Sequence, residues 1–250
     1  MFLKYQQTIN YPVTFKGIGL HSGKISKVKI LPAKEDVGIV FKRVDLGVKN
    51  LIKANFENVS SARLCTTLKN KYGVTVSTVE HLLAALYIAE IDNVIIEIDN
   101  TEVPIMDGSS KKFLADIKSV GVRILPKKRK YLKILEKVEL NDGEKKISIS
   151  PSSNFVIDFK LNYSNKIIGK QKNIINLQTD DLVDLSNSRT FCLFDDIEKI
   201  KKIGLAKGGS LDNAIVVNNE KVLNKGGLRN KKEFVNHKIL DLIGDFLLSE

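Results

Sequence analysis

The chain has 250 residues, 43% of them hydrophobic and 28% charged, which fits one large globular domain or two small ones and excludes a disordered tail or a fibre. Charged residues interrupt every apolar run before it approaches the roughly 20 residues that a membrane-spanning helix needs. Residues 1–10 lack the apolar core of a secretory signal, and two cysteines, Cys65 and Cys192, are too few for a disulfide framework. We therefore expect a cytoplasmic protein with free thiols and no transmembrane anchor.

The chain is strongly basic, with 40 Lys and Arg against 29 Asp and Glu and a formal net charge of +11. Such a charge suits nucleic acid, an anionic membrane or a phosphorylated substrate. However, only 6 basic residues are arginine and tryptophan is absent, although phosphate recognition favours arginine and base stacking favours aromatic side chains. Because the cations recur along the whole chain, we interpret them as a lysine-rich solvated surface. A basic nucleic-acid-binding module is the competing interpretation.

The first half of the chain predicts strands followed by helices. One helix is expected to be capped by Ser77 or Thr78, to carry apolar residues at helical spacing and to end at 91–93. The other expected elements are strands at 25–30, 38–41, 74–76 and 94–98 and a second helix at 111–120.

Pro126 and the four cations after it are the strongest linker signal, so we place a domain boundary at 126–130. Strands and then helices follow again, and the last helix, over 231–248, has a broad apolar stripe. The other expected elements are strands at 131–140, 145–150, 155–161 and 214–217 and short helices at 180–185 and 195–203. This order indicates an α+β protein of two similar sheet-plus-helix domains, 1–126 and 131–250.

The residues with the most distinctive chemistry are histidines. His237 and Asp241 are four residues apart on the last helix, so they share a face and could bind one metal ion, although a polar helix edge has the same spacing. His81 would be the third ligand, unless its imidazole instead forms a hydrogen bond with a backbone carbonyl. Three protein ligands would leave a tetrahedral zinc ion one open position for water. Glu80 would then be the general base for that water, or else a solvent-facing residue at the helix edge.

Six stretches follow one another along nearly the whole chain in the order of a known family. They are GIGLHSG at 17–23, STVEHL at 77–82, VPIMDGS at 103–109, SRTF at 188–191, GGSLDNA at 208–214, and the region from VNHK at 235–238 through Asp245. With these motifs the chain resembles the UDP-3-O-acyl-N-acetylglucosamine deacetylases, zinc amidases that carry out the committed step of lipid A synthesis in Gram-negative bacteria. The resemblance implies two domains packed face to face in layered sandwiches, with the active site between them.

The resemblance also implies roles for single residues. It makes His81, His237 and Asp241 the ligands of Zn²⁺ and Glu80 the base that activates water. Thr190 matches a threonine whose hydroxyl stabilises the oxyanion, and Lys238 matches a lysine that contacts the substrate. Asp245 matches an aspartate that orients and charges a catalytic histidine, and in this chain we expect its carboxylate to be paired to lysine or water. Without the resemblance, Thr190 would be a capped loop residue and Lys238 a solvated one.

The remaining matched positions concern substrate binding. His21 matches an active-site histidine, although its glycine-rich surroundings would also fit a bent turn with a surface histidine. Phe191, Ile200, Ile203 and Leu205 fall where the family builds a passage for the acyl chain, but as a pattern they would also suit a core. The expected partner is an acylated UDP-amino-sugar and not nucleic acid. We expect a monomer. Peripheral contact with a membrane is compatible with this expectation.

The chain departs from the family pattern after the last helix. The family continues into a Lys-x-Gly-His motif whose histidine protonates the leaving amine, and no fourth histidine is present here. We therefore expect either a truncated product or a version without a general acid, which normally contributes about 10²- to 10⁴-fold in rate. A metal-binding but inactive protein is the corresponding alternative function.

Overall fold

The computed structural model describes residues 4–249 and has a mixed α/β fold. A five-stranded sheet with the spatial order β2-β3-β9-β4-β5 organises the first half. Its neighbouring strands run antiparallel, except that β4 and β9 are parallel. Successive side chains point to opposite faces, so β3 buries Val28 and Ile30 and exposes Lys27 and Lys29. The strands are β2 (Val13–Ile18), β3 (Ile25–Pro32), β4 (Ile39–Arg43), β5 (Leu51–Lys53) and β9 (Val94–Ile98).

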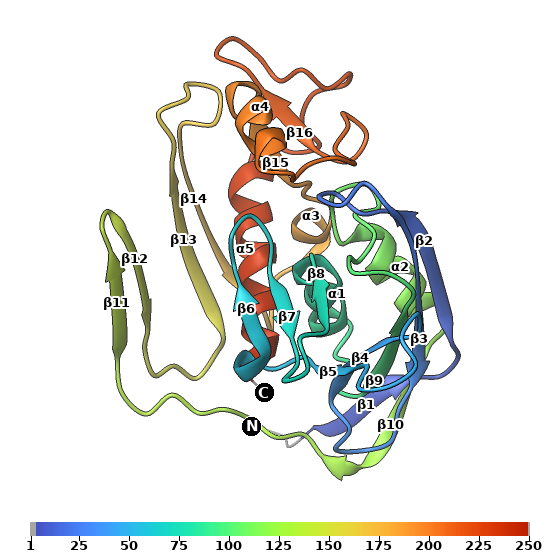
Figure 1. The fold of residues 1–250 in the computed structure, drawn as a ribbon. Helices are drawn as coiled ribbons and strands as arrows, with labels where there is room; N and C mark the ends of the chain where they lie inside the picture. The colour runs from blue at the N-terminus through green and yellow to red at the C-terminus, as the bar shows by residue number, and fades with distance from the viewer. Residues whose placement is uncertain (1–3, 250) are drawn as a thin grey trace.

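Two helices, α1 (Glu80–Ile88) and α2 (Lys111–Ser119), pack against this sheet on the side that faces the centre of the molecule (Figure 1). Leucine and alanine, which favour helix, make up most of α1. Their apolar side chains occupy nearly every face of the helix. A helix that is apolar all round has to be buried, and residues 80–86 of α1 are. The helix ends where Glu90 takes a φ of 57°.

Smaller sheets complete the first half. One joins β6 (Val59–Ser61), β7 (Thr67–Lys69) and β8 (Thr75–Ser77), after the 3-10 helix η1 (Phe56–Asn58). The other pairs β1 (Tyr5–Ile9) with β10 (Val122–Lys128), so strand structure continues through Pro126, where a linker was predicted. Because β10 pairs with β1 alone and the register shifts between Tyr5 and Gln7, a residue without an N–H is tolerated there.

The second half is organised around α5 (Glu233–Phe246), which runs through the centre of Figure 1. It packs against α1 on one side and against the β13–β14 hairpin on another. Toward its N-terminal end lie the parallel strands β15 and β16 and the helices α3 and α4. The β11–β12 hairpin lies at the left-hand edge of the view. The elements are β11 (Val138–Asp142), β12 (Lys145–Ile149), β13 (Val156–Asn162), β14 (Lys170–Asn176), α3 (Val183–Ser186), β15 (Phe191–Leu193), α4 (Phe194–Lys202), β16 (Ile215–Val217) and η2 (Leu247–Ser249).

Two apolar clusters form the interior. The first joins the five-stranded sheet to α1 and α2 and includes fully buried Phe15, Phe41 and Phe113. The second surrounds α5 and includes Phe234 and the α1 residue Ala84. Burying one such large side chain contributes about 1.5–3 kcal/mol to the stability of the fold. Residues of α1 belong to both clusters, so this helix connects the two halves.

The sequence located most long elements and missed most short ones. The strand at 94–98 and the helices predicted at 111–120, 195–203 and 231–248 are confirmed to within a few residues. The predicted strand at 131–140 is wrong before Val138, and the helix predicted at 180–185 is the single turn α3. The strands β1, β2, β5, β6, β7, β10, β14 and β15 were not predicted.

The predicted cap of the first helix is also wrong. Neither Ser77 nor Thr78 caps α1, which begins after Val79 without a side-chain cap. Thr78 has a φ of 57°, and its hydroxyl donates to Glu102 instead, at 2.9 Å. The acceptor for this threonine therefore comes from a distant part of the chain.

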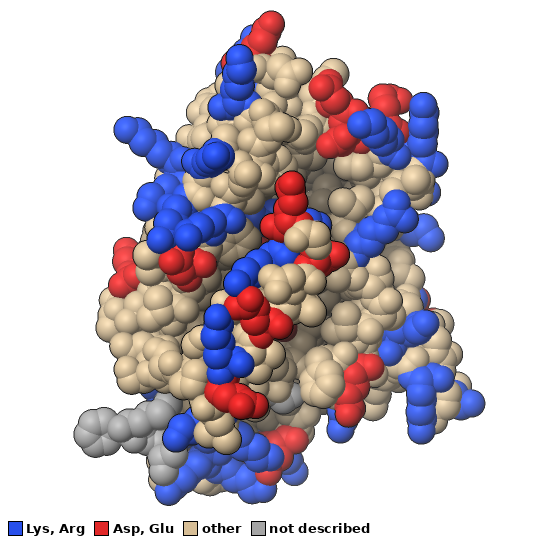
Figure 2. All heavy atoms as spheres, turned by 90° about the vertical axis from the view of Figure 1, so that its left-hand side faces the viewer, with Lys and Arg blue, Asp and Glu red and all other residues tan. Residues whose placement is uncertain are grey.

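One face of the molecule shows a dispersed basic charge. On the face shown in Figure 2, lysine and arginine side chains are spread widely and acidic side chains lie among them. Across residues 4–249, no helix combines the length and the apolar composition needed to cross a membrane.

Candidate metal centre

The helices α1 and α5 bring two histidines and an aspartate together. His81 is the second residue of α1, and His237 and Asp241 lie one turn apart on α5. Asp241 Oδ1 is 3.4 Å from His81 Nε2 and 3.3 Å from His237 Nε2. One ligand atom from each of the three residues lies within 4.8 Å of the other two. The predicted combination of His81, His237 and Asp241 therefore exists as a cluster in space.

The donor set of this cluster suits a divalent metal ion. Both histidines are buried, and Asp241 Oδ1 is buried with no hydrogen-bond partner within residues 4–249. His237 Nδ1 lies 3.1 Å from the carbonyl oxygen of Ser188 and can donate its proton there, which leaves Nε2 as an electron-pair donor. Two imidazole nitrogens and one carboxylate oxygen around one point are ligands that zinc prefers. The residues present therefore fit such an ion.

The electrostatics of the cluster keep Asp241 ionised. Burial alone would raise the pKa of Asp241, but His237, Lys238 and His81 outweigh burial and hold the pKa well below its ordinary value. Burial lowers the pKa of His237 to about 3, against the opposing charge of Asp241. A neutral imidazole at His237 and an ionised carboxylate at Asp241 are the protonation states in which these side chains bind metals.

Glu80 begins α1 and is buried beside the cluster, so the alternative of a solvent-facing residue is wrong. Its Oε2 accepts the backbone N–H of Thr66 at 3.1 Å. Burial raises the pKa of Glu80 to about 7; Asp241 acts in the same direction and His81 against it. Glu80 is not one of the three converging ligands.

Lys238 and Phe191 border the cluster. Lys238 Nζ lies 3.0 Å from Asp241 Oδ2 and 5.5 Å from the centroid of the Phe191 ring. The Phe191 ring also packs edge-on against His237, with 6.3 Å between ring centroids. A cation and an apolar ring thus stand next to the converging ligands.

Asp245 lies one turn beyond Asp241 on α5, and its partner differs from the prediction. Its Oδ1 accepts the hydroxyl of Thr66 at 2.7 Å, where lysine or water was expected. Thr66 therefore connects Asp245 to Glu80, one through its hydroxyl and the other through its backbone N–H. The sequence offered no signal for Thr66, because a loop threonine before β7 has no distinctive spacing.

Thr190 is half-buried just before β15 and is fixed through its backbone. Its N–H donates to the carbonyl of Gly108 at 2.7 Å, and its own carbonyl accepts the N–H of Ile215 at 2.8 Å. A Cβ at Gly108 would stand 2.2 Å from the carbonyl oxygen of Asn213, so the VPIMDGS and GGSLDNA motifs meet in backbone contact. These contacts bring the threonine loop against both motifs.

His21 is buried, so a turn with a surface histidine is wrong, and it lies outside the converging set. Its backbone N–H donates to Glu102 Oε1 at 2.8 Å, and its Nδ1 accepts the N–H of Ala206 at 3.4 Å. Glu102, which the sequence did not single out, also binds the Ser22 N–H at 2.7 Å and thereby holds the GIGLHSG loop. Burial lowers the pKa of His21.

Of the residues matched to an acyl passage, Phe191 lies on β15, and Ile200, Ile203 and Leu205 lie on and after α4. None of the α4 residues is buried, and Ile203, directly after the helix, is 50% exposed, so a core role is wrong for Ile203, whereas Phe191 packs against the second apolar cluster. Ile200 and Leu205 are half-buried. The chain after Leu205 returns to His21, because the Lys207 N–H donates to the His21 carbonyl at 3.3 Å.

Comparison with known proteins agrees with the motifs. The family model described as UDP-3-O-acyl N-acetylglycosamine deacetylase matches residues 6–250. Proteins named UDP-3-O-acyl-N-acetylglucosamine deacetylase are similar to this chain in several bacteria. The one from Syntrophotalea carbinolica is 45% identical over 98% of this chain and 79% of its own length. Those from Lawsonia intracellularis and Phenylobacterium zucineum are 42% and 40% identical, over 97% and 98% of this chain and 80% and 84% of their own lengths.

Proposed function

Because the chain belongs to the family of UDP-3-O-acyl-N-acetylglucosamine deacetylases, we propose that it hydrolyses the 2-acetamido group of UDP-3-O-acyl-N-acetylglucosamine to a free amine and acetate. In the family this is the committed step of lipid A biosynthesis. The observation that carries the proposal is the convergence of His81 Nε2, His237 Nε2 and Asp241 Oδ1 from two helices.

These three side chains would hold a zinc ion. Residues 4–249 contain no second group of three His, Cys, Asp or Glu residues that converge in this way. When bound, zinc supplies Lewis-acid polarisation of the acetamide carbonyl and makes water a better nucleophile at neutral pH. Three protein ligands leave a tetrahedral ion one position for these functions, as in catalytic sites. The mixed nitrogen and oxygen donor set also suits other divalent ions such as Fe²⁺, so the choice of zinc rests on the family.

Glu80 is the proposed general base. It accepts a proton from the water that attacks the acetamide carbon, and the protonated carboxyl of Glu80 then passes this proton to the departing amine nitrogen, so the transfer balances. The Thr66 N–H holds one oxygen of Glu80 at 3.1 Å, which keeps the carboxylate in a fixed orientation beside the cluster. The hydroxyl of Thr190 is the proposed donor to the oxyanion that forms as the carbonyl is attacked.

The surrounding residues are proposed to bind and orient the substrate. Lys238, held by Asp241 at 3.0 Å, would contact the reacting substrate, and Asp245 occupies the position of the family's aspartate that orients and charges a catalytic histidine. His21 would contact the substrate from the GIGLHSG loop. The acyl chain would run along Phe191, Ile200, Ile203 and Leu205, since Phe191 borders His237 and the α4 residues expose apolar surface.

We further propose that the halves are two domains, 1–126 and 131–250, which pack face to face with the site between them. Separate apolar clusters and the contact of α1 with α5 support this arrangement. The substrate needs no second chain in this proposal, so a monomer is expected. A cytoplasmic location suits the free thiols of Cys65 and Cys192.

The experiment that tests the proposal measures acetate release from the UDP-sugar substrate by the zinc-loaded chain and by an Asp241→Asn variant. We expect release by the native chain, loss of release after chelation and recovery with added zinc. The variant should bind zinc weakly, because an amide oxygen lacks the carboxylate charge. Zinc-loaded native protein that releases no acetate would contradict the proposed activity.

A further inference from the structure

The peptide group between Ser188 and Arg189 connects two side chains of α5. Its carbonyl oxygen, on Ser188, lies 3.1 Å from His237 Nδ1. Its N–H, on Arg189, donates to Glu233 Oε1 at 3.1 Å. Glu233 and His237 are four residues apart, so they face the same side of the helix and hold the two ends of one planar group.

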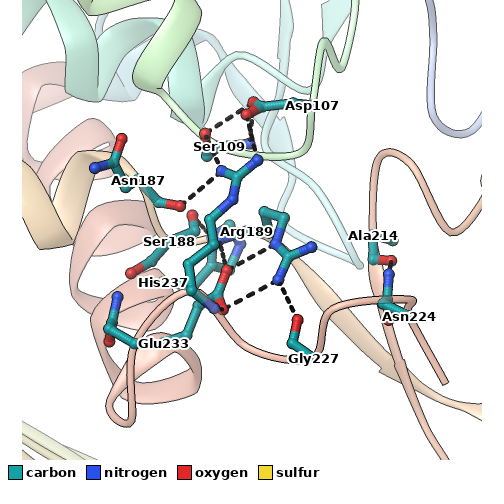
Figure 3. A network of polar contacts seen from close by, with 12 residues as sticks. Asp107, Ser109, Asn187, Ser188, Arg189, Ala214, Asn224, Gly227, Glu233 and His237 are labelled. Carbon is teal, nitrogen blue, oxygen red and sulfur yellow. Dashed lines mark hydrogen bonds and ion pairs between the residues drawn. The ribbon is translucent and has the colours of Figure 1, made fainter. Parts of the chain in front are cut away.

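Glu233 is fully buried and binds four N–H groups. Besides the Arg189 backbone, Oε1 accepts Arg189 Nε at 2.8 Å. Oε2 accepts Arg189 Nη2 at 3.2 Å and the Arg229 backbone N–H at 2.6 Å. Arg189 Nη2 also donates to the Gly227 carbonyl at 2.9 Å. Figure 3 shows Arg189 and Glu233 side by side, with the Ser188 carbonyl directed at His237.

We propose that Glu233 and Arg189 are positioning residues for the metal ligand His237, acting through the 188–189 peptide group; this inference rests on the proposed function. The ion pair fixes the plane of the peptide. The peptide carbonyl then holds the proton of His237 on Nδ1 and directs Nε2 toward Asp241.

The physical reason is a hydrogen-bonded chain from carboxylate to imidazole. The other ring nitrogen of a histidine ligand usually donates to a carboxylate or a carbonyl, which fixes its tautomer and raises its basicity. Here the carboxylate acts one peptide away. Its negative charge at the N–H end polarises the peptide and strengthens the carbonyl as an acceptor, as hydrogen bonds in a chain do.

The contacts of Glu233 with Arg189 also affect the position of Thr190, the residue after Arg189. Its backbone is already held by Gly108 and Ile215. With the preceding peptide fixed by Glu233, the threonine and His237 are set by one rigid unit. A change at Glu233 should therefore be felt at the cluster although this side chain is not one of the three converging ligands.

The experiment uses Glu233→Gln and the double variant Arg189→Met/Glu233→Leu, which removes both charges. Removing only one partner leaves a buried charge unpaired and strongly destabilises a protein, whereas replacing both with apolar residues of similar size is often tolerated. The matched controls are Asp92→Asn and Asp92→Leu/Arg129→Met. Asp92 binds the Arg129 guanidinium at 2.6 Å and the Gln7 backbone N–H at 2.7 Å, so it is a similar clamp on other elements.

The first readout is the tautomer of His237 in the metal-free chain, from ¹⁵N chemical shifts of the three imidazoles. Native protein and both controls should show His237 protonated at Nδ1. Both Glu233 variants should show a mixture of tautomers. The second readout is zinc affinity by competition with a chelator, which should fall about 10- to 100-fold in the Glu233 variants only.

The outcomes separate the two proposals. An unchanged His237 tautomer and unchanged zinc affinity in the folded double variant would overturn the positioning role. Equal losses in the Asp92 controls would overturn it as well, because they would show a general effect of stability. A native chain that takes up no zinc would instead refute the proposed function, while the tautomer measurement still decides whether Glu233 acts on His237.

Discussion

Gly244 approaches Glu80 so closely that a Cβ on this glycine would stand 2.1 Å from the Glu80 carbonyl oxygen. The obstacle is backbone, which cannot rotate away as a flexible side chain can. At this crossing α5 passes directly over the start of α1. Since His81 follows Glu80 on α1, and His237 and Asp241 lie on α5, this close contact sets the distance between the two sources of ligands.

Gly244→Ala should therefore separate the two helices. We expect a loss of at least about 1–3 kcal/mol in the free energy of unfolding, measured by urea denaturation, together with weaker zinc binding. Gly47→Ala is the control, because no atom lies within 4 Å of the corresponding Cβ. Native-like stability and zinc affinity in Gly244→Ala would show that the crossing adjusts without cost.

The cluster should bind one zinc ion per chain, since His81, His237 and Asp241 form one set of three ligands in residues 4–249. His237→Ala should abolish tight binding, as measured by atomic absorption after dialysis. His21→Ala should leave the zinc content unchanged, because His21 is outside the converging set. Tight zinc retained by His237→Ala would place the ion elsewhere.

Glu80→Gln separates the base from the ligands. Glutamine keeps the size of the side chain and an oxygen for the Thr66 N–H, but it cannot accept the proton of the attacking water. We expect kcat to fall by about 10²-fold or more and the zinc content to stay the same. If the variant loses its zinc, Glu80 is itself a ligand and the division of roles is incorrect.

Thr66→Val removes the hydroxyl that binds Asp245 and keeps the backbone N–H that binds Glu80. Asp245 is exposed, so water can replace this partner, and the free energy of unfolding should fall by only about 0.5–1.5 kcal/mol, the net contribution of one hydrogen bond. Thr67→Val is a neighbouring control, since its hydroxyl has only a 3.8 Å contact with the Cys65 sulfur. Equal unfolding midpoints for the two variants would argue against a bond of that strength.

Salt dependence distinguishes the deacetylase from the nucleic-acid-binding alternative. A protein that neutralises several phosphates of duplex DNA loses about 10³-fold or more in affinity between 50 and 200 mM salt. UDP carries few charges, so its binding should depend weakly on salt. Calorimetric titrations with UDP and with duplex DNA test this, and tight, steeply salt-dependent DNA binding would favour the alternative.

The sequence by itself determined the features that lie within one element. His237 and Asp241 share a helix face because four residues make about one turn, and this needs no knowledge of the rest of the chain. The strand at 94–98 and the apolar stripe of α5 are local patterns of the same kind. Joining His81 to the pair stayed one of two open interpretations until the resemblance to a family was added, because 156 positions separate His81 from His237.

Only the tertiary structure decided which distant groups satisfy one another. Thr66 binds Asp245, Glu102 takes the hydroxyl of Thr78, and Glu233 holds the peptide behind His237. A buried polar group must find a partner, but any chemically suitable donor can fill that need, so residue type does not identify the partner. The packing of distant segments makes the choice, since it fixes which side chains come within hydrogen-bond distance, as when α5 brings Asp245 to the loop before β7.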